Sequence, residues 1–352
     1  MSDTAFLVLE NGSVFQGHFF GARGQITGEI VFTTGMTGYL ETLTDPSYHG
    51  QIVLQTFPLI GNYGVIPADF ESDMVGAKAY MVKHPCQDPS NFREEGSLDT
   101  FLKSRGIVGL WGIDTRALTK VIRENGVMNG KITTAPPTEG DRQEAAAYTI
   151  HNPVAAVSTK TVVQMGSGSR RIALLDFGAK RGMVEALTNR GCRVWRFPHD
   201  TTAETIMQIK PDGILLSNGP GDPGDPANKS IVATIGLLQQ RGVPILGICL
   251  GHQLLALANG YTTRKLKFGH RGANQPVKDM ATGRVYITSQ NHGYEVDTEK
   301  GSFVNVNDSS CEGLDYGNSF SVQFHPEARG GPLDTAFLFD RFVERVNAYA
   351  IG

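Results

Sequence analysis

Residues 247–253, with the sequence GICLGHQ, restrict the fold of this chain more than any other stretch. A short apolar run at 243–246 precedes them, and a second apolar run at 254–258 ends before Asn259-Gly260. The first run predicts a buried strand and the second a buried helix. Cys249 then lies in a sharp strand-to-helix turn, with a glycine two residues away on each side. This is the spacing of a nucleophile elbow, with cysteine in place of the usual serine.

The chemistry of this turn suits a reactive thiol. Glycines allow the sharp bend and the close approach of a substrate, and a helix N-terminus favours thiolate over thiol. The alternative is an inert cysteine packed between apolar elements, which is the common state of a free cysteine. Taken alone, the elbow does not decide between the two, and the decision depends on the rest of the chain.

Strands and helices alternate around the elbow. Apolar runs at 171–176, 193–197 and 213–217 predict strands, and helical patterns lie between them and at 231–240. This rhythm predicts an α/β fold with a doubly wound, mostly parallel sheet, whose active crevice lies at the carboxyl ends of the strands. Further strands are expected near 284–288, 303–306 and 320–324, and a closing helix at 333–349. We assign residues 170–352 to this domain.

The first part of the chain has a less regular pattern. Residues 5–9, 29–32 and 51–54 predict strands, Asn11-Gly12 predicts a hairpin turn, and residues 98–104 and 115–125 predict helices. Asp114 or Thr115 is expected to cap the second helix, and Gly126 to end it. We assign residues 1–131 to a mixed α/β N-terminal domain. Residues 132–169 are polar and loop-like and predict a linker, with a helical segment near 142–148.

Composition excludes several functional classes. The 352 residues carry a net charge of −3, which argues against a nucleic-acid partner. No apolar run is long enough to cross a bilayer, and no basic or Arg/Ser-rich leader is evident, so we expect a cytoplasmic protein without membrane contact. The four cysteines form no C-x-x-C pair, which indicates a reducing compartment and no structural zinc site. We expect no metal and no nucleotide cofactor in this chain, because ligand pairs and phosphate-binding motifs are missing.

Three polar stretches follow predicted strands and are candidates to join Cys249. Residues 218–223 (NGPGDP) offer backbone N–H groups to an oxyanion, although a plain turn has the same composition. Residues 289–294 (SQNHGY) carry amide groups that suit an amino-acid substrate, although a polar connecting loop is the simpler interpretation. Residues 325–327 (HPE) place an imidazole and a carboxylate two residues apart on an extended path.

A cysteine nucleophile needs a group that takes up a proton and later returns it. Imidazole does both near neutral pH, and a carboxylate fixes its tautomer. His325 has Glu327 close in sequence, whereas the competing His292 has no neighbouring carboxylate. We therefore predict a triad of Cys249, His325 and Glu327. A surface turn with an incidental histidine is the alternative.

The combination of these motifs, in this order, resembles the class I (triad-type) glutamine amidotransferase domain. The first domain adds Met36-Thr37-Gly38-Tyr39, residues 43–48 (LTDPSY), Gly61-Asn62 and residues 112–116 (GIDTR). Together with residues 176–180 (DFGAK) and 291–293 (NHG), these are similar to the small subunit of carbamoyl-phosphate synthetase. The resemblance covers essentially the whole chain.

The resemblance implies roles for named residues. Cys249 attacks the side-chain amide of L-glutamine and forms a glutamyl thioester, while His325, held by Glu327, shuttles the proton. The N–H groups of Gly221 and Leu250 stabilise the oxyanion. The residues that match glutamine-binding positions are Ser47, Gly219, Gly221, Leu250, Gln253, Asn291, Gly293 and Tyr294. Ser47, which sits in a polar turn, would otherwise be taken as a surface residue, and Tyr294 stands where the family often has phenylalanine.

The resemblance also implies a partner. In such proteins the ammonia passes through a tunnel to a large subunit that uses ATP and Mg²⁺ to make carbamoyl phosphate from bicarbonate, for arginine or pyrimidine synthesis. Two other functions remain open on the residues. The chain could serve another synthetase or act as a free γ-glutamyl hydrolase, or it could be a non-catalytic scaffold. The first domain argues against another synthetase and against a free hydrolase. The intact Cys249, His325 and Glu327 argue against a non-catalytic scaffold.

Overall fold

The computed structural model describes residues 3–351, which divide into two compact units on either side of the boundary between His151 and Asn152. Each unit has its own sheet and its own hydrophobic core. No helix among the described residues is long and apolar enough to span a bilayer.

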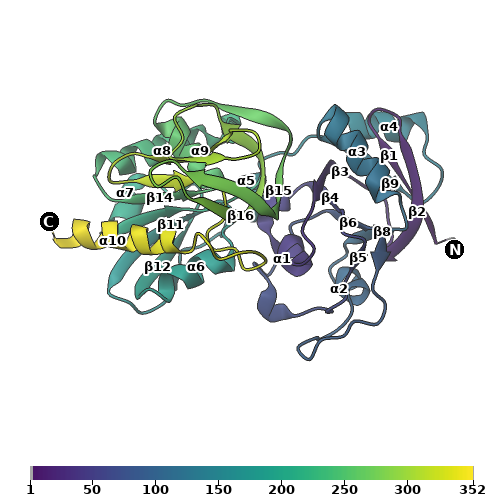
Figure 1. Ribbon diagram of the computed structural model, residues 1–352, viewed down its shortest axis with the longest axis horizontal. Coiled ribbons are helices and arrows are strands. Elements are labelled where there is room, and N and C mark those ends of the chain that lie inside the picture. The colour runs from purple at the N-terminus through teal and green to yellow at the C-terminus, as the bar shows by residue number, and fades with distance from the viewer. Residues whose placement is uncertain (1–2, 352) are drawn as a thin grey trace. The chain divides into compact units, whose positions relative to one another are not determined.

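The first unit is built on a closed barrel (Figure 1). Its strand order is β1-β2-β8-β6-β4-β3-β9, with parallel pairing along β3-β4-β6-β8 and antiparallel pairing elsewhere. The bounds are β1 Thr4–Leu9, β2 Val14–Gly21, β3 Ile26–Thr33, β4 Gln51–Gln55, β6 Ala79–Val82, β8 Val108–Trp111 and β9 Met128–Thr133. Two short strands, β5 Leu59–Ile60 and β7 His84–Pro85, pair outside the barrel. The predicted turn at Asn11-Gly12 joins β1 to β2, with Gly12 at φ 87°.

The helices of the first unit follow their capping signals. The predicted helices are present as α2 (Leu98–Ser104) and α3 (Thr115–Asn125). The Asp114 side chain accepts from Ala117 N–H at 2.9 Å, and Gly126 ends α3 at φ 96°. A short helix that the sequence did not predict, α1 (Tyr39–Thr44), contributes Tyr39, Leu40 and Leu43 to the core. The 3₁₀ turns are η1 (Pro46–Tyr48) and η2 (Pro67–Asp69).

The stretch predicted as a linker, residues 132–169, contains regular structure that belongs to both units. Helix α4 (Glu139–Ala146) starts with a capping box between Thr138 and Asp141. The ammonium of Lys131 on β9 lies 2.8 Å from Asp141 and 2.6 Å from Glu144, so charge pairs tie α4 to the barrel. Helix α5 (Pro153–Val157) and strand β10 (Val163–Met165) belong to the second unit, where β10 pairs with β12. The division of the chain therefore falls at 151/152.

The second unit has the predicted alternation of strands and helices. Five strands form the parallel part of its sheet, in the order β12-β11-β13-β14-β19. Their bounds are β11 Arg170–Asp176, β12 Cys192–Pro198, β13 Gly213–Leu216, β14 Ile245–Ile248 and β19 Phe320–Val322. The helices are α6 Arg181–Thr188, α7 Ala203–Met207, α8 Lys229–Gln240, α9 Leu250–Ala258 and α10 Phe337–Ile351, with a 3₁₀ turn, η3, at Pro226–Asn228.

Side chains of β11 alternate between two cores. Ile172 and Leu174 pack with residues of α6 and α10, whereas Ala173 and Leu175 pack with residues of α7, α8 and α9. Helices α6 and α10 therefore cover one face of the parallel strands, and the other three cover the opposite face (Figure 1). This is the doubly wound arrangement that the sequence predicted.

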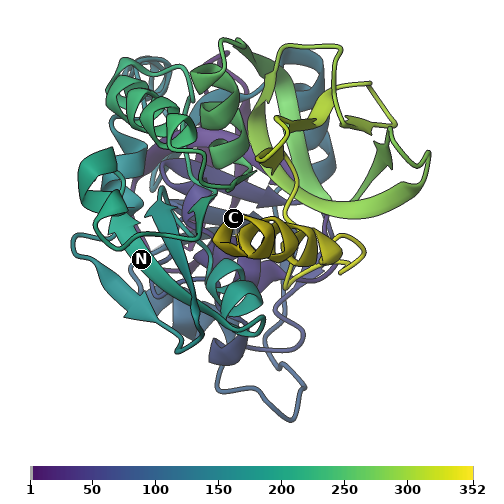
Figure 2. The same ribbon diagram turned by 90° about the vertical axis from the view of Figure 1, so that its left-hand side faces the viewer.

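The remaining strands extend the sheet by antiparallel pairing and curve away from its parallel part (Figure 2). They are β15 Thr263–Asp279, β16 Val285–Val296, β17 Phe303–Asn305 and β18 Cys311–Asp315. No signal in the sequence predicted the long strand β15. The strand predicted near 284–288 was expected to end before residues 289–294, whereas β16 runs through them. The predicted parallel pairing is thus present in the five strands of the parallel part, whereas β15 to β18 pair antiparallel.

Candidate active site

The chemical groups of the site follow the carboxyl ends of neighbouring parallel strands. Cys249 follows β14, the loop 217–223 follows β13, Lys180 follows β11, and His325 follows β19. Because these strands are parallel and adjacent, their carboxyl ends lie at the same edge of the sheet.

Cys249 occupies a strained turn between β14 and α9. Its backbone has φ 56° and ψ −107°, a conformation that residues other than glycine rarely adopt. Its N–H donates to Val322 O at 2.9 Å. A β-carbon on Gly251 would collide with the carbonyl oxygen of Leu216, and one on Gly247 would lie 2.6 Å from Gly251 O. The two glycines therefore let the helix start directly against the neighbouring strand, as an elbow requires.

His325 and Glu327 form a buried pair that Lys180 joins. His325 Nδ1 lies 2.6 Å from Glu327 Oε1, and the Lys180 ammonium donates to the same carboxylate oxygen at 3.0 Å. Neither side chain of the pair is more than 2% exposed. Lys180 belongs to the motif at 176–180, but no role for it could be predicted from the sequence, because it lies 145 residues before His325.

The charges around this pair set its protonation. Burial raises the pKa of Glu327, but the Lys180 ammonium and the His325 imidazolium outweigh it and lower that pKa to about 2. Burial and Lys180 lower the pKa of His325, while the Glu327 carboxylate and Cys249 raise it to about 10. A carboxylate therefore holds a proton on the imidazole of His325.

Cys249 lies close enough to His325 to raise its pKa. The buried Nε2 of His325 lacks a hydrogen bond of good geometry among the described residues. The Cys249 thiol instead points to the backbone carbonyl of Asn291, with Sγ 3.6 Å from the oxygen. Cys249 is only 2% exposed.

The glycine loop after β13 lies against the start of α9. A β-carbon on Gly219 would collide with Phe177 O and lie 2.8 Å from the Leu250 side chain. Gly221 has φ 94°, which favours glycine. Leu250 is the first residue of α9, so its N–H has no partner within the helix. The loop and the helix start are thus adjacent, as the prediction of two oxyanion donors requires.

Five of the predicted glutamine contacts, Leu250 among them, lie on α9 and β16. Gln253 donates from Nε2 to Tyr294 O at 2.7 Å and to Gln323 Oε1 at 2.9 Å, which joins the helix to β16. Asn291, Gly293 and Tyr294 are consecutive or near-consecutive residues of that strand, and Asn291 O is the acceptor for the Cys249 thiol. Ser47 belongs to the first unit, in η1, where its N–H donates to Asp45 Oδ1 at 2.9 Å.

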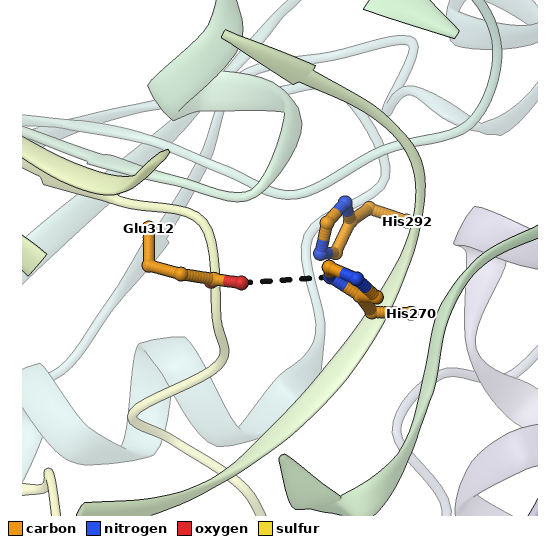
Figure 3. A group of neighbouring side chains, drawn as sticks. All are labelled: His270, His292 and Glu312. Atoms are coloured by element: carbon orange, nitrogen blue, oxygen red, sulfur yellow. Dashed lines mark ion pairs between the residues drawn. The ribbon is translucent and has the colours of Figure 1, made fainter. Parts of the chain in front are cut away.

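His292, the competing base, lies in a different environment. Its Nδ1 is 2.8 Å from Tyr294 O, and its Nε2 is 3.0 Å from Gln290 Oε1. Burial, followed by the charge of His270, lowers its pKa well below the ordinary value, so the ring stays neutral. It lies beside His270 and faces Glu312, and the three residues bring ligand-type atoms within 4.8 Å of one another (Figure 3). This cluster could not be predicted from the sequence, because its members are far apart in the chain.

Comparison with protein families covers both units. Residues 7–132 match the family model for the carbamoyl-phosphate synthase small chain, CPSase domain, and residues 173–345 match the model for class I glutamine amidotransferases.

Individual relatives match over nearly the full length. The chain is 48% identical to the carbamoyl phosphate synthase small chain of Fusobacterium nucleatum, over 97% of this chain and 98% of the relative. It is also 48% identical to the pyrimidine-specific small chain of Bacillus subtilis, over 97% and 95% of the two chains. Among solved structures, a glutamine amidotransferase from Thermotoga maritima covers 53% of this chain and 84% of its own, with 17% identity and a TM-score of 0.39.

Proposed function

This chain belongs to the carbamoyl phosphate synthase small-chain family, and we propose that its Cys249, His325 and Glu327 hydrolyse L-glutamine through a glutamyl thioester. The chain is the glutamine amidotransferase component of the synthase. The single observation that carries the proposed mechanism is the pairing of a buried imidazole–carboxylate couple with a thiol in a strained elbow at one sheet edge.

The reaction starts with the Cys249 thiolate, whose proton His325 holds. The sulfur attacks the amide carbonyl of glutamine and forms a C–S bond, and the carbonyl oxygen becomes an oxyanion. Collapse of this intermediate breaks the C–N bond, and the imidazolium protonates the leaving nitrogen, which departs as ammonia. Neutral His325 then takes a proton from water, and the hydroxide forms a C–O bond to the thioester carbon. Collapse of this second intermediate breaks the C–S bond and returns the sulfur as a thiolate beside the imidazolium. The carboxylic acid product gives its proton to solvent and leaves as glutamate.

The surrounding residues support each step. Glu327 keeps the imidazole in one orientation through its 2.6 Å contact with Nδ1, and Lys180 fixes the carboxylate at 3.0 Å. The N–H groups of Gly221 and Leu250 donate to the oxyanion, where preorganised donors contribute most to the rate. Loss of one such donor typically costs a factor of about 100 to 1,000 in kcat.

Glutamine binding uses the neighbouring residues of the sheet edge. Both Nε2 hydrogens of Gln253 are used inside the protein, so its Oε1 accepts from the α-ammonium group of the substrate. The other contacts that we propose are made by Ser47, Gly219, Leu250, Asn291, Gly293 and Tyr294.

The ammonia serves a partner chain. We propose a complex with the carbamoyl phosphate synthase large subunit, which uses ATP and Mg²⁺, and we expect no cofactor in this chain. The near-complete coverage of small chains from two bacteria supports this assignment, and the pyrimidine-specific relative supports a role in pyrimidine synthesis. Arginine synthesis is the other destination of carbamoyl phosphate. The four free cysteines suit the reducing cytoplasm, where we place the complex.

The test is the effect of Cys249→Ser on the complex with the large subunit. Carbamoyl phosphate synthesis is measured with glutamine and, separately, with added ammonium chloride. We expect the variant to lose glutamine-dependent synthesis by at least about 10³-fold and to keep ammonia-dependent synthesis. Normal glutamine hydrolysis by the variant would refute the nucleophile. If the wild-type chain hydrolyses glutamine and the large subunit does not increase the rate, the chain is a free-standing hydrolase.

A further inference from the structure

A buried charged cluster lies behind the strand that carries the proposed glutamine contacts. His270 on β15 is its centre, and its Nε2 is 2.8 Å from Asp308 Oδ2. Its Nδ1 is 3.5 Å from Glu312 Oε1 (Figure 3). Glu312, on β18, is fully buried, and Asp308 lies in the turn between β17 and β18. Asp308 is itself held by Ser310, whose N–H and hydroxyl donate to Oδ1 at 3.1 and 2.8 Å. The cluster therefore joins β15 to the β17–β18 turn.

His270 contacts β16 through His292. The two residues are cross-strand partners, and their rings meet edge to face with centroids 5.0 Å apart. His292 Nδ1 in turn donates to Tyr294 O, the same carbonyl that accepts from Gln253. The ring of His292 thus fixes the backbone of residues 292–294. Successive side chains of a strand point to opposite faces, so the side chain of His292 points to one face of β16 and that of Asn291 to the other.

The contacts of these side chains favour a protonated His270 held between the carboxylates of Asp308 and Glu312, which we call the clamp. They do not favour a metal centre. The single N–H of the neutral His292 ring, on Nδ1, is used by Tyr294 O, and Nε2 lies 3.0 Å from the side-chain amide of Gln290. Glu312 Oε1 accepts from Asn305 at 3.0 Å, and His270 lies between two carboxylates. An ion would have to displace a proton and several of these hydrogen bonds. A charged imidazole satisfies the two carboxylates without any such change.

We propose that His270 is a positioning residue for glutamine: held between Asp308 and Glu312, it fixes the His292 ring and, through it, the Asn291–Tyr294 backbone beside Cys249. The inference rests on the proposed function, because it assigns a support to the glutamine-binding strand. Loss of the clamp loosens the strand that contacts the substrate and leaves Cys249, His325 and Glu327 in place. The expected effect is therefore on KM for glutamine and not on kcat.

The experiment measures steady-state glutamine hydrolysis by the complex with the large subunit for the wild type and three variants. His270→Phe keeps a flat ring against His292 but removes both ring nitrogens. We expect its KM for glutamine to rise about tenfold with kcat within about twofold. Asp308→Asn removes one of the two carboxylates at a half-exposed site and is expected to raise KM about threefold. Ammonia-dependent synthesis stays at the wild-type rate in both.

Arg345→Gln is the matched control. Arg345 pairs with Asp315 on β18 at 2.8 Å, so the control breaks an ion pair on the strand of Glu312 without contact to β16. Its KM should equal that of the wild type. A merely structural role of His270 would lower the amount of active protein, and hence apparent kcat, with KM unchanged. If His270→Phe does not fold, as judged by circular dichroism, Asp308→Asn alone carries the test.

Two results would overturn the inference while the proposed function stands. One is an unchanged KM in folded His270→Phe, or in Asp308→Asn when His270→Phe does not fold. The other is stoichiometric zinc in the purified wild type that is lost in His270→Phe, measured by mass spectrometry of the metal, since the cluster would then be a metal centre. A wild-type complex that releases no ammonia from glutamine would instead refute the proposed function, and this inference with it.

Discussion

At the scale of single residues, the site depends on a cysteine held in a backbone conformation that suits glycine. Cys249 has φ 56° and ψ −107°, and such strain typically costs about 1–3 kcal/mol. The strain persists because the glycines at 247 and 251 allow the packed neighbours to fix the turn. It presents the sulfur at the start of α9.

Removing the side chain of Cys249 should therefore relieve strain. We expect Cys249→Gly to be more stable than Cys249→Ala by about 1 kcal/mol, because only glycine adopts this conformation without steric cost. Urea unfolding of the two variants, followed by fluorescence, measures the difference. Equal stability, or a less stable glycine variant, would show that the turn is not strained.

Lys180 is the residue whose electrostatic role is easiest to isolate. Its ammonium lowers the pKa of both His325 and Glu327. In Lys180→Met both pKa values should therefore rise, and the imidazole of His325 should release its proton at a higher pH than in the wild type. A titration of ¹⁵N-labelled histidine by NMR follows the ring directly. A His325 pKa that falls or stays constant would contradict the proposed contact.

At the scale of elements, tight packing at the carboxyl ends of β13 and β14 sets the elbow. A β-carbon on Gly251 would collide with Leu216 O, whereas one on Gly236, in the middle of α8, would meet no atom within 4 Å. Both glycines lie in helices, so the same substitution has opposite consequences at the two positions.

Gly251→Ala should lower the free energy of unfolding by about 1–3 kcal/mol, because backbone must shift to admit the methyl group. Gly236→Ala should raise it by about 0.5–1 kcal/mol, because alanine is the better helix former. Thermal unfolding of both variants by calorimetry tests the pair. A stable Gly251→Ala protein would mean that α9 does not need close contact with β13.

Elements with local signals could be predicted from the sequence, and those formed by distant pairing could not. Helices α2 and α3 have clear caps, and the five parallel strands are apolar. Strand β15 is rich in charged residues and glycine, and it is held by its partner β16, so no periodic pattern marks it. For the same reason the polar residues 289–294 favour a loop on sequence alone, although they lie within β16.

The site divides in the same way. Cys249 and the pair of His325 and Glu327 could be proposed because their motifs are short. Lys180 and the cluster around His270 could not, because the fold brings their members together over long sequence separations. The predicted linker at 132–169 lacks long apolar runs. Its helix α4 is held by a capping box and by ion pairs to Lys131, and its strand β10 by pairing with β12.

At the scale of the whole molecule, buried histidines couple stability to pH. Asp308 and Glu312 outweigh burial and raise the pKa of His270 from an ordinary 6.5 to about 9. The folded protein therefore binds a proton that the unfolded chain releases between these values. The stabilisation is complete below pH 6.5 and is lost as the pH rises through 9.

The unfolding free energy should thus fall with pH between 6.5 and 9, and it should fall less steeply in His270→Phe. Urea midpoints measured at half-unit pH intervals compare the two proteins, with Arg345→Gln as a variant that keeps the wild-type slope. Parallel curves for the wild type and His270→Phe would show that His270 carries no excess proton in the folded state.

In the proposed mechanism Cys249 carries the substrate covalently. The direct measurement is acid quenching of the complex during turnover of radiolabelled glutamine, followed by digestion and identification of the labelled peptide. We expect the label on the peptide that contains Cys249 in the wild type, and none in Cys249→Ser. A label on another residue, or turnover of glutamine in the serine variant at the wild-type rate, would contradict the account.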